Sequence, residues 1–132
     1  MMRESGEDLQ SFCDKLLERI GGLEAILVTD TYGVPLISAS RTEEREKTGS
    51  ALAATFSVAT EQAGKLKMGK NTTLLSFYSD LLVFQLNLAP LVITMLGEEN
   101  TNAGLLLGLV PELKTVFQPL RKSVSQVDRE MS

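Results

Sequence analysis

Histidine is absent from this chain of 132 residues, and cysteine occurs once, as Cys13. Without histidine the sequence lacks the commonest general base, a usual member of nucleophilic triads and the commonest transition-metal ligand. One cysteine excludes an internal disulfide, and a zinc site built here would have to be almost entirely carboxylate. The sequence therefore predicts no metal site, no cofactor and no catalytic residues, so we expect a protein that is not an enzyme.

The single cysteine lies in a segment whose apolar residues recur at helical spacing. Phe12, Leu16 and Leu17 share an apolar helical face with Cys13. A free thiol in that setting is far more often a small core residue than a nucleophile. A lone cysteine also gives no sign of an oxidising compartment, which makes a cytosolic setting the expectation.

Positive charge is in the minority, because 13 lysines and arginines stand against 17 acidic residues and give a net charge of −4. A surface that follows nucleic-acid phosphates needs clustered positive charge. We therefore expect no nucleic-acid partner.

Long hydrophobic runs are also missing. The longest apolar stretch, Leu81 to Leu96, is interrupted by Gln85, Asn87 and Pro90, and it is shorter than the roughly 20 residues that a spanning helix needs. The first residues are polar and charged, unlike a signal peptide, and the chain carries neither a myristoylation glycine nor a prenylation motif. We expect no direct membrane insertion, so that another protein would have to hold this one at a membrane.

The sequence does contain helical and strand patterns that fit a single domain spanning residues 1–132, with its core at about 9–124. The spacing predicts a helix over Asp8 to Ile20, ended by Gly21-Gly22. Leu23 to Thr29 and Val34 to Ala39 predict a β-hairpin, with Gly33 at the turn position where a positive φ is expected. The charged connector Arg41 to Lys47 fits either a solvated loop or the first turn of a helix.

A helix from Thr48 to Met68 is apolar or small on two neighbouring faces. One face is suited to covering a sheet and contains Leu52, Phe56, Ala59, Ala63 and Leu66. The other consists of short side chains: Ala51, Ala54, Thr55, Val58 and Gln62. A solitary surface helix would usually carry lysine and glutamate there, so the second face is either an association face or buried within one domain.

Three strand patterns follow, over Thr72 to Tyr78, Leu81 to Leu88 and Leu91 to Leu96. Their connectors are short, which favours antiparallel neighbours. Asn102 offers an N-cap for a final helical region, and Pro111 and Pro119 inside it predict a kink near Val110 or two consecutive helices.

This order of elements, together with four segments, resembles the roadblock/dynein light chain family. Within it the chain is most similar to the branch of MAP kinase scaffold subunits of the Ragulator (LAMTOR) complex, which partner the MAP kinase kinase. The matching segments are Gly22 to Asp30 with Gly33-Val34-Pro35, Ser57 to Leu66, Ala89 to Val92, and Asn102 to Leu105. Pro111, Pro119, the Arg41 to Lys47 connector and the polar tail after Val124 depart from the pattern.

The resemblance implies an α+β, profilin-like roadblock/LC7 fold. It has a five-stranded antiparallel sheet with the middle helix on one face and the N- and C-terminal helices on the other. In the family, the middle helices of two subunits pack side by side and the following strands extend one sheet across both chains. By resemblance, the dimer interface here would comprise Ala51, Ala54, Thr55, Val58, Gln62, Thr72, Leu74, Leu75 and Ser76.

By resemblance the function is that of a non-catalytic scaffold subunit, which forms a heterodimer with a second roadblock protein inside Ragulator. Its further partners would be the other Ragulator subunits, the Rag GTPases of TOR complex activation, and MAP kinase kinase with its target MAP kinase. It would work at the cytoplasmic face of late endosomes and lysosomes, held there by partner subunits.

Two alternatives remain open at the level of sequence. One is a homodimeric dynein light chain or a GTPase-regulating roadblock protein, distinguished by self-association. The other is a small enzyme or ligand-binding domain of profilin-like shape. Against it, neither GxxxxGK[ST] nor GxGxxG occurs, and the acidic candidates Asp30, Asp80, Glu98 and Glu99 fall at predicted turns.

Overall fold

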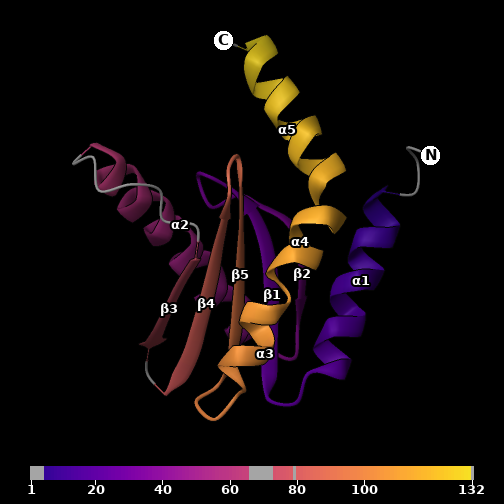
Figure 1. The fold of residues 1–132 in the computed structure, drawn as a ribbon, viewed down its shortest axis with the longest axis vertical. Coiled ribbons are helices and arrows are strands. Elements are labelled where there is room, and N and C mark those ends of the chain that lie inside the picture. Colours follow the sequence, from indigo (N-terminus) through magenta and orange to yellow (C-terminus); the bar gives the residue numbers. More distant parts are fainter. Residues whose placement is uncertain (1–4, 66–72, 79, 132) are drawn as a thin grey trace.

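A five-stranded antiparallel sheet forms the centre of the structure, a computed structural model that describes residues 5–65, 73–78 and 80–131 (Figure 1). The strand order is β2 (Pro35–Ser40), β1 (Leu23–Asp30), β5 (Leu91–Glu98), β4 (Leu81–Leu88) and β3 (Thr73–Tyr78). The predicted hairpin and the three later strands are confirmed, with ends that differ by at most two residues.

The hairpin turn between β1 and β2 is built around one aspartate and one glycine. Asp30 Oδ1 accepts hydrogen bonds from the backbone N–H groups of Tyr32 (2.8 Å) and Val34 (3.0 Å). Gly33 has φ +86°, which a residue with a Cβ rarely adopts. The predicted role of Gly33 is therefore confirmed.

Helices cover both faces of the sheet. On one face, apolar residues of α1 (Ser5–Arg19) and of the C-terminal helices pack in one core with Ile26 and Val28 of β1. On the other face, Leu52 of α2 (Glu43–Lys65) packs against a smaller cluster that contains Ala25 and Leu27 of the same strand. Alternation along β1 thus separates two cores, as a sheet covered on both sides requires, and the predicted layer arrangement is confirmed (Figure 1).

Helix α2 begins at Glu43, so Glu43 to Lys47 of the charged connector form its first turns, which confirms the second of the two predicted alternatives, while Arg41 and Thr42 precede the helix. The Thr42 hydroxyl accepts a hydrogen bond from the Arg45 N–H (3.2 Å), as a capping side chain does. Glu43, Glu44 and Glu46 lie in the first turn, where negative charge is favourable to the helix dipole. The predicted start at Thr48 was therefore too late, and the predicted end at Met68 lies outside the described residues.

The C-terminal region forms three consecutive helices: α3 (Ala103–Gly108), α4 (Val110–Val116) and α5 (Gln118–Met131). Pro111 and Pro119 are each the second residue of a new helix, a place where the missing N–H of proline costs nothing. The sequence predicted one kink or two helices, and the structure has three helices, because a new helix begins at each of the two prolines. Asn102 caps α3 as predicted, its Oδ1 accepting from the Leu105 N–H at 3.1 Å.

Candidate protein-interaction surface

The first part of the predicted interface lies on the side of α2 that faces away from the sheet. Ala51 and Thr55 are exposed there, whereas Ala53, on the sheet side, is completely buried. The Thr55 hydroxyl donates to the Ala51 carbonyl (3.1 Å), which satisfies the only polar group of this pair within the helix. The side chains on this surface are short, and the Thr55 hydroxyl already has a hydrogen-bond partner within the helix. Another backbone could therefore pack closely against it. Val58 and Gln62 lie further along α2, and their side chains are outside the part of the chain that the structure describes.

Ala54 lies at the border of this surface, half-buried against the hairpin turn of the same chain. A Cβ placed on Gly33 would be 3.0 Å from the Ala54 Cβ, so the turn touches the helix with no side chain between them. Of the predicted helix residues, Ala51 and Thr55 are thus open to a partner, while Ala54 is partly occupied by its own chain.

Two contacts that sequence reasoning missed hold α2 on the sheet. Gly49 faces Leu27 so closely that a Cβ on it would lie 2.5 Å from the Leu27 Cδ1. Gln85, a buried residue of β4, donates from Nε2 to the Leu52 carbonyl of α2 (3.0 Å) and to the Thr94 hydroxyl of β5 (3.3 Å). The glycine inside a predicted helix and the glutamine inside an apolar strand were the available signals.

The second part of the predicted interface is β3, the last strand of the sheet. It pairs with β4 in six registered pairs, from Thr73 with Leu86 to Tyr78 with Leu81, and its other side has no partner among the described residues. Leu74 (39%), Leu75 (37%) and Ser76 are exposed. Thr72, also predicted for this interface, lies outside the described residues.

The two edges of the sheet differ in how far they are protected. The β2 edge begins with Pro35, and the side chain of Gln10 in α1 donates to the outer strand at the Ser38 carbonyl (2.8 Å). Its register to β1 also shifts between Val28 and Thr29. In contrast, β3 carries no proline, no charged residue and no register shift. Natural sheets usually protect their edges with such features, so β3 is the edge at which another strand can pair.

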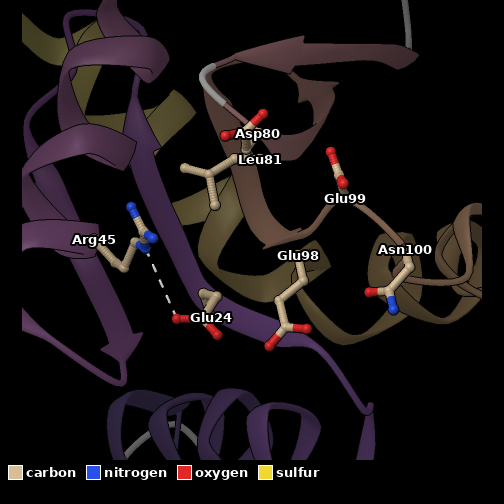
Figure 2. Close-up of a pocket in the computed structure, with 7 residues that line it drawn as sticks. All are labelled: Glu24, Arg45, Asp80, Leu81, Glu98, Glu99 and Asn100. Carbon is tan, nitrogen blue, oxygen red and sulfur yellow. Dashed lines mark ion pairs between the residues drawn. The ribbon is translucent and has the colours of Figure 1, made fainter.

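A separate cavity of about 510 Å³ lies where β1, β4 and β5 meet the start of α2 (Figure 2). It is lined by four carboxylates, one guanidinium, one amide and one leucine: Glu24, Asp80, Glu98, Glu99, Arg45, Asn100 and Leu81. Arg45 Nε lies 3.8 Å from Glu24 Oε1, and Asp80, Glu98 and Glu99 are exposed. Among the described residues no group of three acidic, cysteine or histidine side chains could hold a metal ion.

Cys13 is completely buried in the core beneath α1. Burial, with a smaller contribution from the charge of Asp14, raises the pKa of its thiol from 9.0 to about 12. A thiol that stays protonated is a poor nucleophile, so the predicted core role of Cys13 is confirmed. Within the residues described, no helix is both long and apolar enough to cross a membrane.

Comparison with known proteins agrees with this architecture. The family model described as "Mitogen-activated protein kinase kinase 1 interacting" matches residues 7–124. The Ragulator complex protein LAMTOR3-A of Xenopus laevis is 39% identical over 119 residues, which cover 89% of this chain and 97% of that protein. The LAMTOR3 homologue of Drosophila melanogaster is 34% identical over 121 residues, covering 91% and 98%.

Solved structures with the same fold are more distant in sequence. The Roadblock/LC7 domain from Streptomyces avermitilis superposes with a TM-score of 0.70 at 14% identity, covering 84% of this chain and 95% of that domain. The gliding protein MglB from Thermus thermophilus gives 0.72 at 10% identity, covering 90% and 92%. These matches establish the roadblock/LC7 fold. The description of the matching family names an interaction and not a catalytic activity, in keeping with a protein that is not an enzyme. The chain therefore belongs to the MAP kinase kinase 1-interacting family of roadblock-fold proteins, the family that its sequence resembles.

Proposed function

We propose that this protein is a scaffold subunit of a Ragulator complex, in which it forms a heterodimer with a second roadblock protein. The LAMTOR3 relatives support this proposal because the similarity covers 97% and 98% of the Xenopus and Drosophila proteins. Binding would be its whole activity.

The observation that carries the proposal is the unprotected β3 edge, together with the small outer face of α2 at Ala51 and Thr55. A partner strand that pairs with β3 would give its outer N–H and C=O groups hydrogen-bonding partners. A partner helix could then approach α2 closely over Ala51 and Thr55, because neither side chain is long. The two contacts together would continue both the sheet and one helical layer from one chain into the next.

The finer roles follow from the names of the relatives and from the resemblance. The family description supports binding of MAP kinase kinase, and the resemblance extends the proposal to its target MAP kinase. Membership of Ragulator would bring the protein to the other Ragulator subunits and to the Rag GTPases that serve TOR complex activation. We place it at the cytoplasmic face of late endosomes and lysosomes, held there by subunits other than itself.

The solution mass of the purified chain tests this proposal, measured by light scattering alone and after co-expression with a roadblock-fold Ragulator subunit of the same organism. A stable one-to-one complex is the expected result. A tight homodimer that ignores the added subunit would replace the proposal with a dynein light chain or a GTPase-regulating roadblock protein. A monomer in both samples would contradict a pairing surface altogether.

A further inference from the structure

Phe77 in β3 is 70% exposed, an unusual position for a phenylalanine inside a regular strand. Its partner in the β3–β4 register is Leu82, and two residues earlier Leu75 pairs with Phe84. Leu82 and Phe84 are 3% and 0% exposed and belong to the larger core beneath α1 and the C-terminal helices. Leu75 and Phe77 therefore continue that apolar layer by one strand beyond its buried part.

The helices that bury the layer stop before β3. In Figure 1, α3 and α4 cross in front of β5 and β1, and no labelled helix lies in front of β3. Directly paired residues of antiparallel strands point to the same side of a sheet. Leu75 and Phe77 therefore lie on the same face as their partners Phe84 and Leu82, which is the face opposite α2. We call these two side chains the outer apolar pair.

We propose that the partner strand covers the outer apolar pair with large apolar side chains of its own, two residues apart, on the sheet face opposite α2. This inference rests on the proposed pairing with a second roadblock subunit and extends it to Phe77, a residue outside the predicted interface, and to the sheet face that Phe77 shares with Leu75. The occupant is a strand because the pair sits on an edge whose outer backbone groups only a strand can match in series. It is apolar because no charged side chain lies in Thr73–Tyr78 to pair with a charge.

Strand geometry fixes the form of the contact. Side chains on one face of a strand recur every second residue, so the residues opposite Leu75 and Phe77 are themselves separated by one residue. A partner strand paired with β3 would contact side chains on both faces of β3. It would meet Leu74 and Ser76 on the α2 side, and Leu75 and Phe77 on the other side. Partial burial of an aromatic anchor near the centre of an interface is a common source of its affinity and selectivity.

The test is the Kd of the complex with the roadblock-fold Ragulator subunit, measured by calorimetry for matched variants. We expect Phe77→Ser to weaken binding by about tenfold or more, and Phe77→Leu, which keeps an apolar group, by less than about threefold. The control is Leu36→Ser, which removes an exposed leucine (41%, against 70% for Phe77) from the protected β2 edge; its Kd should match that of the wild type. Binding by Phe77→Ser within threefold of the wild type would overturn the inference and leave the proposed function intact.

A double-mutant cycle keeps the test informative if Phe77→Ser disturbs β3 itself. One apolar residue in the pairing strand of the added subunit is changed to serine, alone and together with Phe77→Leu. Non-additive losses would support direct contact across the strand pair, whereas additive losses at every apolar residue of that strand would overturn it. Failure of the wild-type chain to bind the added subunit would instead remove the proposed function, and this inference with it.

Discussion

Gly49 of α2 lies against Leu27 of β1 with no room for a methyl group, since a Cβ on Gly49 would be 2.5 Å from the Leu27 Cδ1. The absence of one side chain therefore sets how closely this helix approaches the sheet. The same contact sets the distance between the sheet and the outer surface of α2. A substitution at Gly49 thus tests both the packing of the core and the placement of the proposed interface.

We expect Gly49→Ala to lower the free energy of unfolding by about 1–3 kcal/mol through overpacking. Alanine is otherwise the better helix former by about 1 kcal/mol, so a loss would identify the contact with Leu27 as the cause. Urea denaturation followed by circular dichroism measures the change. Gly108→Ala is the matched control, because a Cβ on Gly108 of α3 meets nothing within 4 Å; this variant should be as stable as the wild type or more so.

Leu74→Asp should abolish binding of the roadblock partner while the monomer stays folded. Leu74 is 39% exposed on the β3 edge, so the aspartate would be hydrated in the free chain and lose that hydration in the complex, at a cost of several kcal/mol. Calorimetry gives the affinity and thermal unfolding checks the monomer. Lys114→Asp, at an exposed position of α4, is the control and should bind normally. Wild-type affinity in Leu74→Asp would exclude β3 from the interface.

Ala51→Asp tests the α2 part of the surface in the same way, and it should weaken binding of the roadblock partner. Ala51 is exposed on the side of α2 away from the sheet, so a carboxylate there should leave unfolding unchanged and prevent close approach of a second helix. An affinity loss at Leu74 without one at Ala51 would indicate strand pairing without helix packing.

Gln85→Met should cost about 1–3 kcal/mol of stability, because the Thr94 hydroxyl, in a fully buried residue, loses the hydrogen bond to Gln85 Nε2. Adding Thr94→Val removes the orphaned group, and the double variant should recover part of the loss. Urea midpoints of the four proteins measure the coupling. Additive losses would mean that the two side chains contribute independently.

We expect the burial of Cys13 to lower the free energy of unfolding at alkaline pH. Burial raises the pKa of its thiol from 9.0 to about 12, so above pH 9 the unfolded chain loses a proton that the folded chain retains. The free energy of unfolding should therefore decrease as pH rises from about 9 towards about 12, by roughly 1 kcal/mol at pH 10. Comparing urea denaturation of the wild type and Cys13→Ala at pH 7.5 and 10 isolates the contribution of the Cys13 thiol to the pH dependence of stability. Equal pH slopes in the two proteins would contradict it.

Periodicity and turn chemistry predicted the strands, the hairpin and the helices themselves, because these depend on local spacing and on turn residues. The five-stranded sheet and the placement of the helices on its two faces were implied by the family resemblance. The sequence left the connector before Thr48 undecided between a loop and a first helical turn, because glutamates that favour a first turn also favour solvated loops. Arg41, in the same connector, donates to the Leu23 and Leu17 carbonyls (both 2.8 Å) and so ties α1 to β1. Such a long-range bond leaves no periodic signal.

For the candidate surface, short side chains on a helix indicated the exposed positions Ala51 and Thr55, and the family resemblance indicated β3. Neither revealed that Ala54 would touch Gly33, because that contact joins residues brought together only by the fold. Phe77 was missed for a related reason. A strand pattern gives the face of a side chain, but whether a helix covers that face depends on where the helices end.

The difference between the protected β2 edge and the bare β3 edge also limits how large an assembly can grow. A chain with two open edges can add neighbours without end and form a fibre, whereas a chain with one can only terminate a sheet. Gln10 and Pro35, far from the partner surface, would then be what keeps pairing finite. If β3 is the pairing edge as proposed, two chains would share one sheet and no open edge would be left for a third.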